Sequence, residues 1–429
     1  MSDRAAPAAE GAGTAVPRLV PGACVKPFDS AMPGFRFLLE HPSGKRWRIA
    51  SELQAIITEI DNVSGVEDIA QRVSAKTNGA VRREDVPGII GGLLVEMGIV
   101  ECPPGTGCEP ASGARPSARR ASPLTWKIPL VSPTVLRPVT SVLQFLFKRY
   151  VAAGILIAVL AINAVTFAKH PALLSPWNHN FADDTCLYVL LLSTFSMLFH
   201  ELGHASACRY FGARHGGIGT GIYLCFPVLY ADVTDAWSLP RSQRAVVDIA
   251  GVYFQAIYAA LLMAAALRNS QPYLLWAAVI VDISCFSSLS PFLRRDGYWL
   301  ISDIAGIPNL SAKTIRHWFG RDGTSVSLPP GIRVVLCAYG VGAAVFVCYL
   351  AYGLNSYLHE VFREGYAQRV REMLALLEKA GNGGAWAPLV PVTLRVAVPA
   401  FVIGTVAIAG VRSWRYVAGR NNNLERGMR

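Results

Sequence analysis

The chain has 429 residues, of which 52% are hydrophobic and 16% charged, and its formal net charge is +11. A soluble domain normally carries about 25% charged residues, so this composition favours a membrane protein. The lysines and arginines gather at the ends of apolar runs rather than in a stripe with aromatic residues, so no nucleic-acid partner is expected.

Two segments have the composition of unpacked chain. Residues 1–17 are rich in alanine, proline and glycine and contain no apolar signal-peptide core, so we expect a disordered tail that stays in the cytosol. Residues 102–128 are rich in proline, glycine, serine and arginine, which predicts a flexible linker. The nine cysteines contain no CxxC pair, so neither a disulfide scaffold nor a thiolate metal site is expected.

The segment 18–101 between them has the pattern of a small soluble α+β domain. Phe35–Ile49 reads as two short strands around a Pro-Ser-Gly turn. Three helices follow, one capped by Ser51 and the others beginning at Val66 and Asp85, and a short strand follows at Val100. A hairpin with three helices predicts a winged-helix-like fold on the cytosolic side.

The remainder, 129–420, is expected to be a polytopic α-helical membrane domain, because it contains repeated apolar runs of nearly 20 residues or more. The six expected spans are Tyr150–Ala168, Cys186–Cys208, Ala245–Leu267, Tyr273–Leu293, Ile332–Leu354 and Leu389–Val411. Basic residues precede the first span and follow the last, and they crowd the loops after the second and fourth spans. The positive-inside rule therefore places both termini in the cytosol.

The second span ends in the motif HELGH, with two histidines four positions apart. On a helix, His200 and His204 share one face and can bind the same ion. A hydrolytic zinc site adds one more protein ligand and keeps a position open, and Glu201 has the spacing of its general base. We therefore expect one Zn²⁺ per chain, with Glu201 as the catalytic residue.

The third ligand is not part of the motif. The positions that would make a metzincin are Ala207 and Tyr210, and the next glutamate after Glu201 is Glu360, assigned to the opposite membrane face. An aspartate is what remains in the relevant region. Asp296, which follows the fourth span on the same face as HELGH, is the first choice, with Asp248 and Asp232 as secondary candidates.

HELGH followed by SPFLRRDGYW after a later span resembles the site-2 protease family of intramembrane zinc metallopeptidases. The family pattern pairs HExxH with NxxPxxxxDG, and the match places Pro291, the ligand Asp296 and Gly297 at the corresponding positions. The stretches FPVLYADVTDAW and DGYWLISD are similar to the peptide zinc metalloprotease branch of bacterial peptide-maturation and export clusters.

Ser288 stands where this family has an asparagine that orients substrate or stabilises the oxyanion. Ser288 and Ser290 are the candidates for that role here. The resemblance also implies that the segment 218–235 binds an extended substrate near the metal.

The N-terminal domain is similar to PqqD-like domains, which bind leader peptides by β-augmentation, and either Phe35–Glu40 or Arg46–Ala50 could offer the strand edge. The alternative is that this domain serves only docking or stability.

Together these patterns lead us to expect a zinc endopeptidase in the bacterial cytoplasmic membrane. It would cleave a membrane-associated or ribosomally made precursor peptide near the cytosolic face, in peptide maturation or export, with an export or peptide-modifying protein as a further partner. The alternative is a catalytically inactive peptide-binding, export or immunity component, which the serine at position 288 favours.

Overall fold

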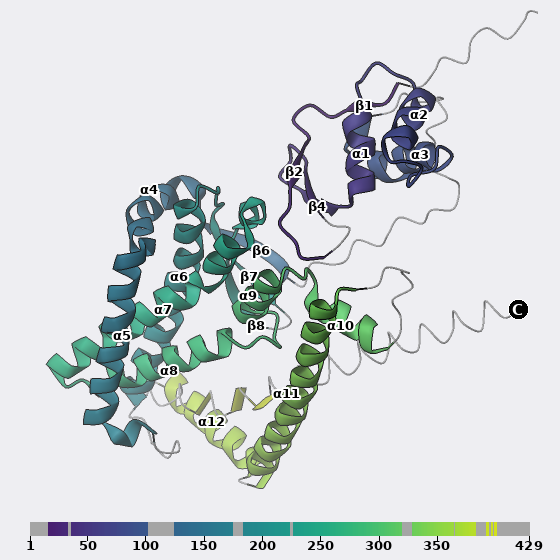
Figure 1. Cartoon of the computed structure of the whole chain (residues 1–429). Helices are drawn as coiled ribbons and strands as arrows, with labels where there is room; N and C mark the ends of the chain where they lie inside the picture. Colours follow the sequence, from purple (N-terminus) through teal and green to yellow (C-terminus); the bar gives the residue numbers. More distant parts are fainter. Residues whose placement is uncertain are drawn as a thin grey trace, which may run out of the picture. The chain divides into compact units, whose positions relative to one another are not determined.

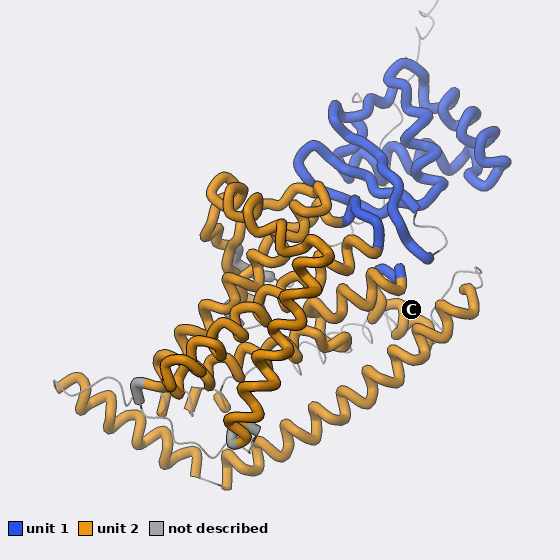
Figure 2. Tube along the Cα trace, turned by 60° about the vertical axis from the view of Figure 1, so that its left-hand side comes forward, with its two compact units in different colours: residues 1–121, 237–241, 306–308 blue, residues 122–236, 242–305, 309–429 orange. Residues whose placement is uncertain are grey.

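The computed structural model describes residues 16–32, 36–101, 124–174, 183–223, 226–319, 328–363 and 365–382, and three residue pairs between 392 and 400. The chain divides into two compact units (Figure 2), which are described separately. The first comprises residues 1–121, 237–241 and 306–308, and the second comprises 122–236, 242–305 and 309–429. The expected tail 1–17 lies almost wholly outside the described residues, since description starts at residue 16.

The first unit contains a three-stranded antiparallel sheet. Its strands are β2 (Cys24–Pro27), β3 (Phe37–Glu40) and β4 (Arg46–Ile49), in that order. The hairpin expected around the Pro-Ser-Gly turn is the β3–β4 pair, but β2 adds a third strand that was not expected. A separate two-residue pair joins β1 (Arg18–Leu19) to β5 (Val100–Glu101).

The extra strand changes which edges of this sheet are open. Strand β3 is hydrogen-bonded on both sides, to β2 and β4, and Leu38 and Leu39 are buried. The expectation that Phe35–Glu40 could supply a free edge is therefore wrong. Within the described residues, β4 and β2 form the two edges, so Arg46–Ala50 remains the candidate of the original pair.

Helices pack against this sheet to form the core of the first unit (Figure 1). They are α1 (Ser51–Glu59), α2 (Val66–Lys76) and α3 (Asp85–Gly88), which continues as a π-helical turn over Ile89–Leu94. In α2 the apolar residues Ile69, Ala70 and Val73 recur with helical spacing and are completely buried. Helices α2 and α3 begin where the sequence predicts them. Ser51 was expected to cap α1 but is its first residue, and Ala50 takes the N-cap position without a side-chain hydrogen bond.

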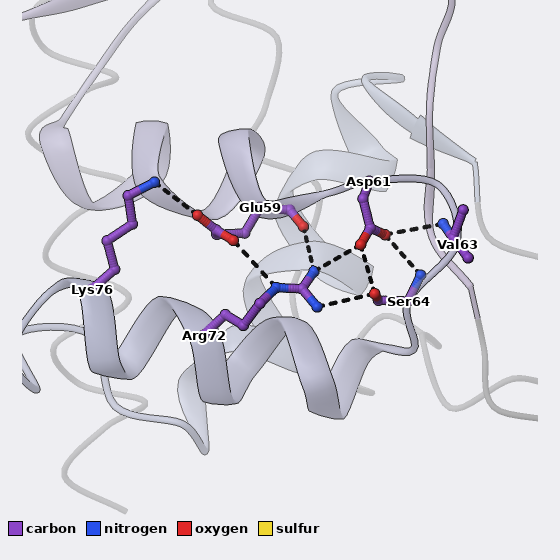
Figure 3. Close-up of polar contacts among 6 residues, drawn as sticks. All are labelled: Glu59, Asp61, Val63, Ser64, Arg72 and Lys76. Atoms are coloured by element: carbon purple, nitrogen blue, oxygen red, sulfur yellow. Dashed lines mark hydrogen bonds and ion pairs between the residues drawn. The ribbon is translucent and has the colours of Figure 1, made fainter.

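The loop between α1 and α2 is held by the guanidinium of Arg72 (Figure 3). Arg72 donates from Nε to Glu59 (3.2 Å), from Nη1 to Ser64 (3.0 Å) and from Nη2 to Asp61 (3.0 Å). Lys76 lies 2.7 Å from Glu59. The hydrogen bond from Lys76, followed by the contacts with Arg72, lowers the pKa of Glu59, and the bonds from Ser64 and then Val63 lower the pKa of Asp61 well below its usual range.

Arg72→Gln is expected to destabilise the first unit by about 1–2 kcal/mol, because hydrogen bonds to charged groups are worth about 1.5–3 kcal/mol and solvent weakens these half-exposed ones. Folding lowers both carboxyl pKa values, so their contribution is fully present above the ordinary values of 4.5 for Glu59 and 3.8 for Asp61 and is lost as pH falls through the lower folded-state values. Hydrogen exchange of residues 51–76 in the full-length protein, followed against urea at pH 7 and pH 3, measures both effects.

Arg83→Gln is the matched control, since it removes an ion pair with Glu67 whose partners are 51% and 66% exposed. It should cost less than about 0.5 kcal/mol. An equal effect of the two substitutions at pH 7 would contradict the role assigned to Arg72.

The second unit is mostly helical, and four of its helices are long and apolar enough to cross a membrane. Its helices are α4 (Pro133–Leu143), α5 (Arg149–Lys169), α6 (Asp183–Tyr210), α7 (Arg241–Asn269), α8 (Pro272–Ser288), α9 (Asp296–Ala305), α10 (Leu310–Trp318), α11 (Pro330–Arg363) and α12 (Tyr366–Gly381). A 3-10 helix, η2 (Gln144–Phe147), joins α4 to α5.

The four long apolar helices, α5, α6, α7 and α11, coincide with four of the six expected spans and suggest a membrane location. The expected span Tyr273–Leu293 is the shorter apolar helix α8, of 17 residues, which ends at Ser288 before Pro291. A proline removes a backbone donor and disfavours helix in the preceding residue, so the helix stops early. The sixth expected span, Leu389–Val411, lies outside the described residues apart from a few positions.

Helix α7 is the central helix of this unit. In its most apolar 18-residue window 67% of the residues are buried, against 11% in α5 and 6% in α11. Its residues Val252, Tyr258 and Met263 pack with Ala277 and Val281 of α8 in one apolar core. Helices α5 and α11 leave most of their apolar surface exposed, as expected of helices that face lipid.

A second three-stranded antiparallel sheet lies in this unit, with β6 (Leu124–Val131), β7 (Ile218–Tyr223) and β8 (Phe226–Ala231) in that order. Residues 124–128 were expected in the linker 102–128, so the linker is shorter than expected. The sequence LTWKIPLV is rich in the large apolar residues that strands favour, and its partner β7 is too distant in sequence for composition to reveal. The remaining linker residues, 102–123, lie outside the described part.

Candidate metal centre

Three potential ligands converge between α6 and the start of α9. His200 Nε2 lies 3.1 Å from His204 Nε2 and 3.1 Å from Asp296 Oδ2. His204 Nε2 lies 3.6 Å from Asp296 Oδ1. His204 is 9% exposed and the other two are half-buried, so the group is shielded from solvent but not sealed. Among the described residues, this is the group that could hold a metal ion.

Local structure explains how these residues meet. The two histidines lie one helical turn apart on α6, so both imidazoles leave the same face. Asp296 is the first residue of α9, and the turn after α8 brings it back towards α6. Gly297 approaches the backbone of Leu289 so closely that a Cβ atom would collide with its carbonyl oxygen. Gly297 therefore permits close packing of the backbone next to Asp296.

Both imidazoles are oriented by hydrogen bonds at Nδ1. His200 Nδ1 lies 2.9 Å from Oε1 of Gln255, and His204 Nδ1 lies 2.7 Å from the carbonyl oxygen of Val247. These oxygens are acceptors, so each Nδ1 carries the proton and each Nε2 has a lone pair that could bind a metal ion. Gln255 donates from Nε2 to Ser196, which fixes the orientation of its amide. Metal-binding histidines commonly have such partners.

Gln255→Leu is expected to weaken metal binding about 10–100-fold, because the buried leucine cannot accept the proton of His200 Nδ1. Competition with a chelator, followed by metal analysis of the protein, measures the affinity. Gln144→Leu serves as a control, since Gln144 donates to the carbonyl of Ser141 on another segment. Unchanged affinity in Gln255→Leu would show that the bond does not orient His200.

Gly251 on α7 makes room for both rings. A Cβ atom at this position would lie 2.5 Å from His204 Nε2 and 2.7 Å from His200 Nε2. Real Cβ atoms do not approach other heavy atoms this closely. Only glycine therefore fits here without displacing the imidazoles.

Glu201 lies beside the ligands and is tied to the second sheet. The backbone N–H of Ala231, the last residue of β8, donates to Glu201 Oε2 at 2.6 Å. The motif carboxylate therefore has a fixed position next to a strand at one edge of the described sheet.

The two serine candidates have different surroundings. Ser288 is completely buried, and its Oγ accepts a hydrogen bond of 2.7 Å from Nη2 of Arg295. Arg295 also donates from Nη1 to Ser287 at 2.8 Å. The hydroxyl of Ser290 is buried and has no hydrogen-bond partner among the described residues.

The secondary candidates Asp232 and Asp248 do not belong to the convergent group. Asp232 accepts bonds from the backbone and the hydroxyl of Thr234, as in an Asx turn. Asp248 lies on α7, and its Oδ2 is buried without a hydrogen-bond partner among the described residues.

The sequence alone does not reveal which residues orient His200 and His204. Gln255 stands out in the sequence as a polar residue in an apolar run, which is a usable signal for a role at a site. Gly251 and the carbonyl of Val247 carry no such signal. Arg295 precedes the candidate ligand Asp296, but nothing in its spacing indicates that it reaches back to Ser287 and Ser288.

No protein-family model, curated protein or solved structure that was compared with this chain matches it.

Proposed function

We propose that this protein is a zinc-dependent membrane endopeptidase with His200, His204 and Asp296 as metal ligands and Glu201 as general base. The observation that carries the proposal is the convergence of the two motif histidines with an aspartate distant in sequence, at 3.1–3.6 Å between ligand atoms. Hydrolytic metal sites use such ligands: a carboxylate shielded from solvent and two imidazoles, each held by a hydrogen bond at Nδ1.

The ligand spacing fits zinc. Ligands about 2.0–2.1 Å from a tetrahedral ion lie about 3.3 Å from one another. The separations of His200 Nε2 from His204 Nε2 and from Asp296 Oδ2, both 3.1 Å, are close to that value. His204 Nε2 lies 3.6 Å from the other carboxylate oxygen of Asp296, Oδ1. Two nitrogens and one carboxylate supply three of four tetrahedral positions and leave one for substrate or water.

His200, His204 and Asp296 would hold the ion, which when bound would supply Lewis-acid chemistry: polarisation of the scissile carbonyl and a lowered pKa of a water molecule. Glu201 accepts the proton of the attacking water at Oε1, while Ala231 holds Oε2 in place. The same carboxyl then passes the proton to the leaving amine nitrogen, and the peptide C–N bond breaks. Gln255 and Val247 keep both imidazoles in the tautomer that binds metal.

The position of the second sheet argues for a substrate in an extended conformation. β8 is an edge strand among the described residues, and its last residue donates to Glu201. A peptide paired with β8 would present its backbone beside the base, and extended chain exposes the peptide groups that a helix hides in its own hydrogen bonds. We propose a membrane-associated or ribosomally made precursor as the substrate, cut near the cytosolic face.

The first unit fits a role in delivery of that precursor. Its β4 and β2 edges could pair with a leader peptide, as in PqqD-like domains. The precursor would then reach the site in extended form, in peptide maturation or export.

A second reading, an inactive peptide-binding, export or immunity component, is favoured by Ser288. Its side chain is completely buried and is shorter than the asparagine of the resembling family, so its hydroxyl has less reach towards a substrate oxyanion.

The two readings are separated by a hydrolysis assay with the detergent-purified protein and fluorescently labelled casein, an unfolded substrate. Hydrolysis that stops on chelation and returns with Zn²⁺, but not with Mg²⁺, supports the enzyme. Bound casein without cleavage in the zinc-loaded protein supports the inactive binder.

A further inference from the structure

Helix α7 carries a buried arginine that forms an ion pair with α9. The side chain of Arg244 is 2% exposed, and its Nε donates to Oδ1 of Asp303 at 2.9 Å. A buried charge without a partner is costly, so Arg244 requires a counter-charge. Charge balance alone does not explain why the partner comes from α9, the helix that begins with the candidate ligand Asp296.

Asp303 lies on the same face of α9 as that ligand. Seven positions, close to two helical turns, separate Asp296 from Asp303, so both side chains leave the helix on one side. At the start of this face Asp296 reaches His200 and His204, and two turns later Asp303 reaches Arg244. The face of α9 that presents the ligand is therefore also the face bound to α7.

The partner face of α7 is the one that holds the two imidazoles. Arg244, Gly251 and Gln255 are spaced by seven and four positions, so they share one face of α7. Gly251 makes room for the rings of His200 and His204, and Gln255 accepts the proton of His200 Nδ1. One face of α7 thus contacts two ligands directly and, through Arg244, the helix that carries the third.

A second fixed point on α9 has a mechanical consequence. Gly297 packs against the backbone of Leu289, which fixes where the helix starts. One contact leaves a helix free to turn about its own axis, and that rotation would move Asp296 away from the imidazoles. The bond at Asp303, about 10 Å further along the axis, prevents it.

Asp248 provides a second carboxylate near Arg244. It lies one turn after Arg244 on α7 and interacts electrostatically with both Arg244 and Asp303. Arg244 therefore keeps a counter-charge when Asp303 is replaced. A substitution at Asp303 removes the link between the helices without leaving an unpaired buried cation.

We propose that Arg244 and Asp303 are positioning residues of the metal centre. Their ion pair sets the rotation of α9 and so holds the carboxylate of Asp296 against His200 and His204. This role rests on the proposed metal site. It differs from a purely stabilising ion pair, because loss of the pair changes the coordination of the bound ion.

The first test measures zinc affinity of the detergent-purified, full-length protein by chelator competition. Asp303→Leu is expected to weaken zinc binding about tenfold, the lower end of the loss when residues that orient metal ligands are replaced. Asp303→Asn should bind zinc nearly as tightly as wild type, because its amide oxygen can still accept the Nε–H of Arg244. Asp303 is 23% exposed, so both variants are expected to fold.

The second test uses Co²⁺ in place of zinc, because its visible spectrum reports coordination. Four-coordinate Co²⁺ absorbs visible light more strongly than five- or six-coordinate Co²⁺, and water molecules replace a ligand that has moved away. At saturating Co²⁺, Asp303→Leu should absorb more weakly than wild type, whereas Asp303→Asn should match wild type. A purely stabilising pair would change thermal unfolding of the metal-free protein and leave the spectrum unchanged.

Arg268→Met is the matched control, since Arg268 is exposed in the last turn of α7, at the other end from Arg244. It should leave zinc affinity and the cobalt spectrum unchanged. Arg244→Met should reproduce the effect of Asp303→Leu from the other side of the pair.

Two outcomes would overturn the proposal in distinguishable ways. If wild type binds both ions and Asp303→Leu has the same zinc affinity and cobalt spectrum, the ion pair does not position Asp296, and the metal centre stands without it. If wild type binds neither ion, the metal centre itself is wrong, and the positioning role falls with it.

Discussion

Replacing Glu201 with glutamine is expected to reduce casein hydrolysis by about 10²–10⁴-fold, the usual contribution of a positioned general base. Glutamine keeps the shape of the side chain, and its amide oxygen can still accept the Ala231 N–H that now reaches Glu201 Oε2. The side chain loses only the ability to take a proton from the attacking water. Zinc content should not change, because Glu201 is not among the convergent ligands.

The matched control is Glu360→Gln, at an exposed position on α11. Its hydrolysis rate should equal that of wild type. Full activity of Glu201→Gln in zinc-loaded protein would contradict the assignment of the base.

Gly251→Ala is expected to weaken zinc binding about 100-fold. This is near the upper end of the loss in metal affinity when residues that orient metal ligands are replaced. The added methyl would lie 2.5 Å from His204 Nε2 and 2.7 Å from His200 Nε2, so the imidazoles or α7 must shift. Overpacking of this kind also costs about 1–3 kcal/mol of folding free energy. Chelator competition measures the zinc affinity, and thermal unfolding of the metal-free protein measures the stability.

Gly154→Ala on α5 makes the same chemical change where a Cβ would meet nothing within 4 Å. It should leave both zinc affinity and stability close to wild type. If Gly251→Ala binds zinc as tightly as this control does, the close approach at Gly251 does not shape the site.

The parts of the site set by local spacing were predictable. His200 and His204 share a face because any helix places positions four apart together, and the motif itself implies a helix. Asp296 was harder, since its place depends on where α8 ends and how the chain returns, and elimination left several aspartates. The orienting contacts of Gln255 and Val247 depend on the packing of α7 against α6, which local sequence patterns do not encode.

In the fold, too, features that depend on local sequence were predictable and features that depend on distant segments were not. Apolar length predicted the four long helices, because hydropathy depends only on local composition. Strand partners depend on distant segments, so β6 appeared where a linker was expected, and β2 closed the edge of β3 that seemed available for a peptide. Which strand edges are open for a peptide to pair with could therefore be seen only in the structure.

The most direct test of the central claim is the zinc content of the purified protein, measured for wild type, His204→Ala, Asp296→Ala and the control Asp232→Ala. We expect about one zinc per chain in wild type and in Asp232→Ala, and none in the other two variants. A wild type without zinc, or an Asp296→Ala variant that keeps it, would contradict the three-ligand centre.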